Sequence, residues 1–276
     1  MFELPEYTIL AQQINTTLSG KIIKHGSLGN SPHKFVWYNR GQEEFDSLTR
    51  GKIIGEAYVK GRWLFIPLEP GYLLLFGECG GKILYHPAGS NLPKKYHLHL
   101  AFTDESFLTA TTQMWGAMEL YKQGDELQRE YVKDMRPTPC DREFTETYFD
   151  DLVIQSAAEK KRSVKSLLTQ EQLIPGLGNA IAQDIMFTAG FHPRRSLTDL
   201  NQTQRKRLYK AIVDTVEDVT DQGGRYDEFN LYGQKGGYTR IMDKHALQKP
   251  CPQCGGEIQK IQYLGGTCYL CPSCQQ

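Results

Sequence analysis

The last 26 residues constrain the fold more than any other part of the chain, because they hold five of its seven cysteines. Cys251 and Cys254 form one C-x2-C pair, and Cys271 and Cys274 form a second. Each such pair on a tight turn directs two thiolates at one point, and two pairs complete a tetrahedral four-thiolate site. We therefore predict one structural zinc ion here, since four protein ligands leave no coordination position for a substrate.

The second pair of zinc ligands is ambiguous in principle, because Cys268 and Cys271 also form a C-x2-C pair. Cys271 and Cys274 are favoured, since both pairs then share the form C-P-x-C and a usual spacing. The intervening residues 257–270 are predicted to form a two-stranded hairpin that turns at Gly265 and Gly266.

Composition places the chain among globular proteins and leaves its partner open. Its 276 residues are 39% hydrophobic and 23% charged, and the formal net charge is zero. A neutral charge counts mildly against nucleic-acid binding. No apolar run is long enough to span a membrane, and residues 1–10 resemble neither a signal nor a transit peptide. We expect a cytoplasmic protein without a membrane partner.

Apolar periodicity changes character along the chain. Residues 6–18 have helical spacing, whereas residues 21–122 contain short branched and aromatic runs separated by Gly/Pro turns, which is typical of an antiparallel sandwich or barrel. Four further helices are predicted, over 144–157, 160–168, 179–189 and 202–219. The expected domains are a β-sandwich domain (1–130), a helical domain (131–221), a flexible loop (222–249) and a zinc finger (250–276).

The segment 173–179, Leu-Ile-Pro-Gly-Leu-Gly-Asn, separates two predicted helices. Pro175, Gly176 and Gly178 end the first helix, and Asn179 is predicted to cap the second. Exposed N–H groups at a helix start form a phosphate site. The same pattern alone is also an ordinary helix–turn–helix connection. Nearby Lys165 favours contact with a nucleic-acid backbone.

Several motifs together resemble the formamidopyrimidine-DNA glycosylase / endonuclease VIII family. The run SLLTQEQLIPGLGNAIAQDIMFTAGFHPRR (166–195) is similar to its helix–two-turn–helix signature. Further matches are Glu-Leu-Pro-Glu at 3–6, Asp134-Met135-x-Pro137, Gly223-Gly224 with Phe229, Gly237-Tyr238 and the terminal CPSCQ. The resemblance covers nearly the whole chain and implies an α+β multidomain fold with an N-terminal helix, an antiparallel β-sandwich, a helix–two-turn–helix domain and a four-cysteine zinc ribbon.

The resemblance also implies a function. Members of the family bind duplex DNA, flip out a damaged base and cleave its glycosidic bond. The expected partner is double-stranded DNA with a damaged base or an abasic site, bound by a monomeric, bacterial-type protein associated with the nucleoid. We expect a DNA N-glycosylase with an altered lesion range and weak or absent lyase activity. One alternative is a catalytically inactive module that binds lesions and recruits repair proteins, and another is a zinc adaptor that has left DNA.

The catalytic positions that the resemblance implies are Met1, Phe2 and Glu3. The family acid/base is retained as Glu3, but Phe2 stands where the nucleophilic proline belongs. A large second residue disfavours removal of Met1. The free amine would then be a primary amine about 3.5 Å, one residue length, from the usual place. Primary amines form Schiff bases, but an offset of this size is expected to lower the catalytic rate strongly.

The DNA-binding positions are mixed. Arg62 stands for the family's strand lysine, and Gly266 stands where the hairpin arginine belongs. The residues that fill the gap left by the flipped nucleotide correspond to Glu78, Met114 and Trp115. The remaining DNA-binding positions that the resemblance implies are Lys165, Gly176, Gly178, Asn179 and, as a stacking group, Tyr238.

Overall fold

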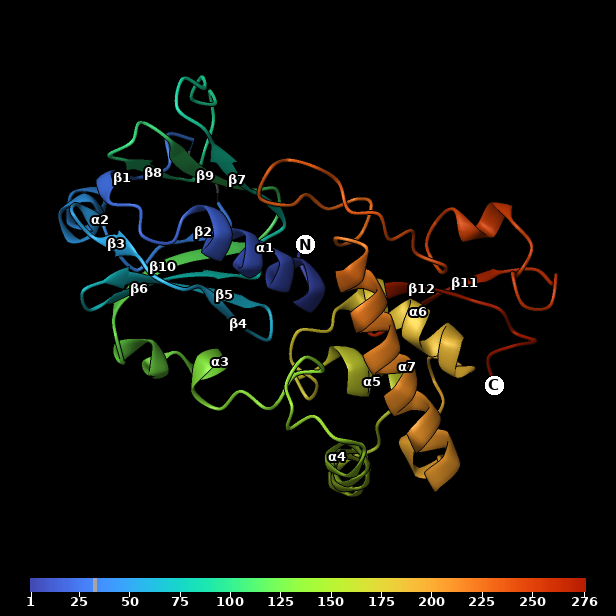
Figure 1. The fold of residues 1–276 in the computed structure, drawn as a ribbon. Coiled ribbons are helices and arrows are strands. Elements are labelled where there is room, and N and C mark those ends of the chain that lie inside the picture. Colours follow the sequence, from blue (N-terminus) through green and yellow to red (C-terminus); the bar gives the residue numbers. More distant parts are fainter. Residues whose placement is uncertain (32–33) are drawn as a thin grey trace. The chain divides into compact units, whose positions relative to one another are not determined.

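The computed structural model describes residues 1–31 and 34–276, and these form two compact units. Unit 1 comprises Met1–Met135 and Thr220–Tyr238, and unit 2 comprises Arg136–Val219 and Thr239–Gln276 (Figure 1). Residues 222–249, predicted as one flexible loop, thus divide at Tyr238 between the two units. Their flexibility and the predicted four-domain boundaries stay predictions. No helix in the described ranges is long and apolar enough to cross a membrane.

Unit 1 is built from two sheets and the N-terminal helix α1, Leu4–Thr17. The four-stranded sheet has the antiparallel order β1-β8-β9-β7. The six-stranded sheet has the order β2-β10-β6-β5-β3, with β4 paired to β5. The strands are β1 (Ile23–Leu28), β2 (Val36–Trp37), β3 (Ile53–Ile54), β4 (Tyr58–Lys60), β5 (Trp63–Glu69), β6 (Tyr72–Gly77), β7 (Gly81–His86), β8 (Leu98–Phe102), β9 (Phe107–Thr112) and β10 (Gly116–Lys122).

The six-stranded sheet has a core on both faces, because successive strand residues point to opposite sides. Leu74 and Phe76 of β6 pack into the main core, together with Leu10 of α1. Their neighbours Leu73 and Leu75 join a smaller cluster with Val132. Val132 belongs to the short helix α3, Glu130–Lys133, which lies below this sheet in Figure 1. The remaining elements of unit 1 are α2 (Gln42–Thr49) and η1 (Asp125–Gln128).

The antiparallel sandwich predicted for residues 21–122 is confirmed, with two departures. The run 52–59 forms two short strands rather than one, because its register against β5 shifts by one residue between the pairs Ile54–Leu68 and Tyr58–Phe65. β2 runs parallel to β10, pairing Val36 with Gly116 and Trp37 with Ala117.

Unit 2 contains four helices and the cysteine hairpin. The helices are α4 (Glu146–Glu159), α5 (Val164–Thr169), α6 (Asn179–Ala189) and α7 (Gln202–Asp221), and the last two residues of α7 lie in unit 1. The hairpin strands are β11 (Gln259–Tyr263) and β12 (Gly266–Leu270). Two 3-10 turns, η2 (Leu197–Asp199) and η3 (Ala246–Gln248), complete the unit. Helix α6 has the predicted bounds, and Gly190 ends it with a φ of 69°. The helix predicted over 160–168 begins later, because the Ser163 side chain caps it by accepting from the Ser166 N–H.

Candidate functional site

The second residue anchors the start of the chain in the core of unit 1. The Phe2 ring is fully buried and packs edge-on against Tyr7, with ring centroids 5.5 Å apart. Its N–H donates to the Cys79 carbonyl over 2.9 Å. Burial raises the pKa of the Cys79 thiol to about 12, so this cysteine stays protonated and is no nucleophile. Phe2 was predicted in the catalytic centre, and this stays a prediction; the structure shows a buried ring that anchors the residue next to Met1.

The terminal amine of Met1 is held by a carboxylate. It donates to Glu228 Oε1 over 2.7 Å, while the Met1 carbonyl accepts from Arg225 Nη2 over 2.8 Å. Burial raises the pKa of Glu228, although the terminal ammonium and Arg225 oppose that shift. Met1 is therefore held at its amine by Glu228 and at its carbonyl by Arg225, two side chains that follow α7 in the sequence.

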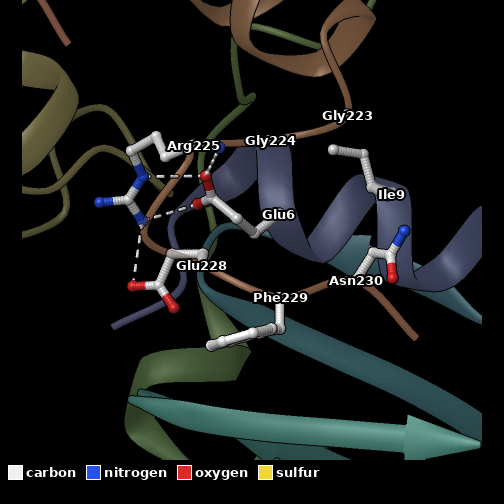
Figure 2. A pocket seen from close by; sticks show the side chains of 8 residues that line it. All are labelled: Glu6, Ile9, Gly223, Gly224, Arg225, Glu228, Phe229 and Asn230. Atoms are coloured by element: carbon white, nitrogen blue, oxygen red, sulfur yellow. Dashed lines mark hydrogen bonds and ion pairs between the residues drawn. The ribbon is translucent and has the colours of Figure 1, made fainter. Parts of the chain in front are cut away.

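Arg225 is the centre of this charged cluster, as Figure 2 shows. It is buried and grips Glu6 of α1 with two bonds of 2.8 Å, one from Nε and one from Nη2. Glu228 Oε1 lies 3.6 Å from Nη2. Burial by itself raises the pKa of Glu6, but the charge and hydrogen bonds of Arg225 outweigh burial and lower it. Both partners therefore stay ionised inside the unit.

Glu3, the predicted acid/base, precedes α1 and is buried. Its carboxylate accepts from the backbone N–H of Glu6, and the Glu6 carboxylate accepts from the N–H of Glu3 over 2.8 Å. This reciprocal capping box holds the first turn of the helix. Glu3 Oε1 also lies 3.8 Å from Arg225 Nη1. The predicted acid/base and the Met1 carbonyl thus contact the same guanidinium.

Sequence reasoning missed Arg225, Glu6 and Glu228. Glu6 was part of the Glu-Leu-Pro-Glu motif but received no role, and Arg225 and Glu228 stand three residues apart in a segment read as a loop. The sequence signal that could have indicated this ion-pair cluster is the Arg-x-x-Glu pair inside the Gly/Tyr-rich stretch. The hollow that these residues share with Gly223, Gly224 and Phe229 has no room for a water molecule (Figure 2). It is a packed ion-pair network and not a substrate cavity.

Arg62, predicted to hold a phosphate, is paired within the protein. Its Nη2 lies 3.0 Å from Glu78 Oε1, and its Nη1 lies 3.9 Å from the Met1 sulfur. Glu78 has a φ of 52°, a left-handed conformation that is costly for a residue with a side chain. Burial raises the pKa of Glu78, while Arg62 acts against that shift. The two side chains therefore stand beside the terminus as a partly buried ion pair.

Of the three other predicted base-contacting residues, two are exposed and one is buried. Met114 and Trp115 lie at the surface, just before β10. Tyr238, predicted as a stacking group, is buried, and its N–H donates to the Gly224 carbonyl over 3.0 Å. In this conformation Tyr238 braces the segment that carries Arg225.

Lys165 and Asn179 in unit 2 both contact the cysteine hairpin. Lys165 is fully buried and its Nζ donates to the Tyr263 carbonyl over 2.6 Å. The Asn179 side-chain amide donates to the Thr267 carbonyl over 3.1 Å. A Cβ atom on Gly266 would lie 3.2 Å from Asn179 Oδ1 and 3.3 Å from Lys165 Nζ. The three predicted DNA-binding positions are thus neighbours.

Two local predictions for this region are wrong. The hairpin turns at Leu264 and Gly265, both with positive φ, and Gly266 pairs with Tyr263 as the first residue of β12. Positive φ at both central residues is the two-residue turn that matches strand twist. Gly178, not Asn179, occupies the cap position of α6, which leaves the Asn179 side chain to reach the hairpin. Gly176 supplies the turn, with a φ of 94°.

The predicted four cysteines come together. The Sγ atoms of Cys251, Cys254, Cys271 and Cys274 all lie within 4.8 Å of one another, with the pairs 251–274 and 254–271 at 3.8 and 3.5 Å. A tetrahedral zinc with bonds of about 2.3 Å separates its sulfur ligands by about 3.8 Å, so the donor set fits a metal. Cys268 is buried outside this group.

Two family models match the chain in the expected order. The formamidopyrimidine-DNA glycosylase N-terminal domain matches residues 1–116, and the formamidopyrimidine-DNA glycosylase H2TH domain matches residues 136–228. Curated relatives are the formamidopyrimidine-DNA glycosylases of Oceanobacillus iheyensis, 28% identical over all of this chain and 98% of the relative, and of Bacillus licheniformis, 28% identical over all of both chains.

Solved structures show the same fold. The Lactococcus lactis Fpg in complex with DNA containing an abasic site has a TM-score of 0.84 and 24% identity over 99% of both chains. A complex of the same protein with DNA containing an oxidised pyrimidine gives equal values of 0.84 and 24%, again over 99% of both chains. The matched models, relatives and fold agree with the motifs, and the chain belongs to the formamidopyrimidine-DNA glycosylase / endonuclease VIII family.

Proposed function

We propose that this protein is a DNA N-glycosylase of base-excision repair that acts on duplex DNA with a damaged base and has an altered lesion range and little or no lyase activity. The observation that carries the proposal is the cluster at the chain start. There a primary amine and Glu3 contact one buried ion-pair network, through Glu228 and Arg225. An amine and a carboxylate are the groups that attack at the sugar and shuttle protons in such chemistry.

Weak strand nicking follows from how the amine is held. The amine lies 2.7 Å from Glu228 Oε1, and an amine held as the ammonium partner of a carboxylate has no lone pair for attack on a sugar carbon. The anchored Phe2 ring also keeps the amine one residue further from the core than a second-residue amine would be. A displacement of this size normally costs a large factor in rate.

Excision can proceed without the amine. Glu3, whose carboxylate lies 3.8 Å from the Arg225 guanidinium, would accept a proton from water as the water oxygen bonds to the sugar carbon and the glycosidic bond breaks. That proton would then pass to the departing base, and no covalent enzyme intermediate forms. The residues responsible for chemistry in this proposal are Glu3 first and Met1 second.

DNA contacts are assigned to Arg62 in unit 1 and, separately, to the α5–α6 turn and the hairpin in unit 2. Asn179 is exposed at the start of α6, where backbone N–H groups favour an anion, and Lys165 lies beside it. Similar folds in complexes with damaged DNA support this partner. We assign zinc to the four cysteines, where it would hold the hairpin against α5 and α6.

A catalytically inactive lesion-binding module is the second candidate. It is favoured by the fact that Arg62 and the terminal amine are both engaged inside the protein, Arg62 with Glu78 and the amine with Glu228. In that case the same surface would bind damage without turnover.

The test uses the full chain and 5′-labelled duplexes that carry an oxidised purine, an oxidised pyrimidine or an abasic site. The abasic duplex, which hot alkali cleaves without any enzyme, reports only lyase activity, as strand breaks before alkali. On the duplexes with an oxidised base, excision without lyase activity predicts strand breaks that appear only after hot alkali. Glu3→Gln should abolish these breaks, whereas Glu43→Gln, an exposed carboxylate of α2, should not.

Borohydride separates the proposed chemistry from the usual one. We expect no covalent adduct on any duplex, and a trapped adduct would show that the amine attacks after all. Tight binding of a damaged duplex with no alkali-revealed breaks would favour the inactive module. Equal affinity for damaged and intact duplexes would refute both candidates.

A further inference from the structure

The loop between α6 and η2 carries an exposed arginine that lies over an aromatic ring of the cysteine hairpin. The Arg194 side chain is exposed, and its Cζ lies 5.0 Å from the centre of the Tyr263 ring. Tyr263 is half-buried at the end of β11, directly before the hairpin turn. A guanidinium at this distance from a ring is held by cation–π attraction. The pair therefore fixes a positive charge beside the hairpin.

The backbone around Arg194 is also fixed. The Arg194 N–H donates to His192 Nδ1 over 3.1 Å, and the Arg195 N–H donates to the His192 carbonyl over 2.9 Å. The Pro193 carbonyl accepts from the backbone N–H of Lys165 over 3.2 Å, which ties the loop to the first turn of α5. A side chain that starts from fixed backbone and rests on a ring loses little conformational freedom when it binds a ligand.

Arg194 differs from most arginines of the described chain in having no carboxylate partner. The net charge of the protein is zero, and arginines such as Arg62, Arg162 and Arg205 form ion pairs with carboxylates. Among residues 1–31 and 34–276, the Arg194 guanidinium has neither an ion pair nor a hydrogen bond. Its five N–H donors are therefore available to an acceptor outside the protein.

The groups around this end of the hairpin favour an anion. The Tyr263 carbonyl accepts from Lys165 Nζ over 2.6 Å, which brings a second cation to the last residue of β11. Tyr263 pairs with Gly266, and the Asn179 side chain lies beside Gly266 at the start of α6. The free N–H groups and the positive dipole end of α6 therefore lie close to the hairpin.

We propose that Arg194 and Tyr263 form a binding site for one backbone phosphate of DNA, in which the ring fixes the guanidinium and the guanidinium donates to the phosphate oxygens. The proposal rests on the proposed function in taking DNA as the partner. A planar guanidinium offers two parallel N–H donors to a phosphate while its flat face stays on the ring. The contact is independent of base sequence and of the lesion, because it reaches only the backbone.

The experiment measures how the affinity of the full-length protein for DNA depends on salt, by fluorescence anisotropy. One duplex carries a tetrahydrofuran abasic-site analogue and the other is intact. Arg194→Ala should weaken binding to both duplexes by roughly tenfold, because it removes one charge-assisted contact. The slope of log K against log salt concentration should also become shallower by about 0.9, as expected for one phosphate contact fewer.

Three further variants separate the ring from the charge. Tyr263→Leu removes the ring and keeps the charge, so the affinity should fall by only about 2- to 5-fold while the salt slope stays unchanged. Tyr263→Phe keeps a flat ring and should bind like the unmodified protein. Arg194→Lys keeps the charge and the slope but loses the two parallel donors, so its affinity should lie between those of Arg194→Ala and the unmodified protein.

The matched control is Arg207→Ala. Arg207 is likewise an exposed arginine of unit 2 that lies over a ring, with its Cζ 4.8 Å from the centre of Phe191. Phe191 follows the C-terminal end of α6, whereas Asn179 begins this helix. The control should therefore keep the affinity and the salt slope. If Arg194→Ala lowers the urea midpoint and leaves the slope unchanged, the stacked pair only braces the hairpin, and the phosphate site is refuted.

The outcomes distinguish this proposal from the proposed function. If Arg194→Ala binds like Arg207→Ala at every salt concentration while damaged bases are still excised, the phosphate site is refuted and the glycosylase proposal stands. If the slope falls for Arg194→Ala alone but no base is excised, the phosphate site stands without the glycosylase. Equal loss of slope in both variants would show a general effect of surface charge and refute the site. If the protein binds neither duplex, both proposals are refuted.

Discussion

At the scale of single residues, the chain start is governed by charges that meet from distant parts of the sequence. Arg225 faces three carboxylates, those of Glu3, Glu6 and Glu228, and it also holds the Met1 carbonyl. Burial tends to lower the pKa of Arg225, but the surrounding carboxylates more than reverse this and raise it. The arginine is therefore permanently charged, and its carboxylates depend on it.

Removing this guanidinium should be severely destabilising. Arg225→Ala leaves buried carboxylates without a partner, which typically costs about 3–5 kcal/mol. Urea unfolding should show this loss. Arg50→Ala removes an exposed pair with Asp46 and should cost at most about 1 kcal/mol. Similar losses for the two variants would show that the cluster is not a stabilising network.

Glu78 should weaken DNA binding by occupying Arg62. Glu78→Gln frees the guanidinium for a phosphate, so affinity should rise. The slope of log K against log salt concentration should also steepen by about 0.9 for one added phosphate contact. Fluorescence anisotropy at several salt concentrations measures both quantities. Glu43→Gln is the control, and an unchanged slope for Glu78→Gln would mean that Arg62 does not reach the backbone.

At the scale of elements, the cysteine hairpin and helices α5 and α6 form one assembly. Phe187 of α6 packs with Met242, Ile258, Cys251 and Cys271. Lys165 and Asn179 donate to carbonyls on both sides of the hairpin turn. The hairpin and the cysteine ligands were apparent from sequence spacing, which is a local property. The turn residues differed by one position because positive φ at Leu264 depends on strand twist.

The metal should hold this assembly together. The native protein should contain one zinc ion per chain by mass spectrometry, and Cys254→Ser should lose it together with thermal stability and DNA affinity. Cys140→Ser changes an exposed cysteine outside the group and should keep the metal. Full zinc retention by Cys254→Ser would refute the ligand assignment.

At the scale of the whole molecule, acid should destabilise the fold through His99 in addition to the carboxylates. Burial, followed by the nearby His25 and His86, lowers the pKa of His99 to about 4. A depressed pKa means that the neutral ring is favoured in the folded state. The contribution of His99 to the free energy of unfolding is therefore fully present above pH 6.5, the ordinary pKa of histidine, and is lost as the pH falls from 6.5 through 4.

His99→Gln should flatten the pH dependence of stability in that window. Urea midpoints at pH 7, 5.5 and 4 should fall less steeply for this variant than for the unmodified protein. His245→Gln, at an exposed position, should follow the unmodified curve. Parallel curves for all three proteins would show that His99 does not contribute.

Sequence alone determined the features that depend on near neighbours in the chain. These are the four-cysteine spacing, the strand alternation of residues 21–122, helix α6 between its glycines, and the family motifs. Only the tertiary structure decided which charges meet. Arg225 and Glu6 are 219 residues apart, and their pairing requires the segment after α7 to return to the first turn of α1. The same holds for Trp37 and Trp115, since no local pattern encodes the parallel pairing of β2 with β10 that stacks them.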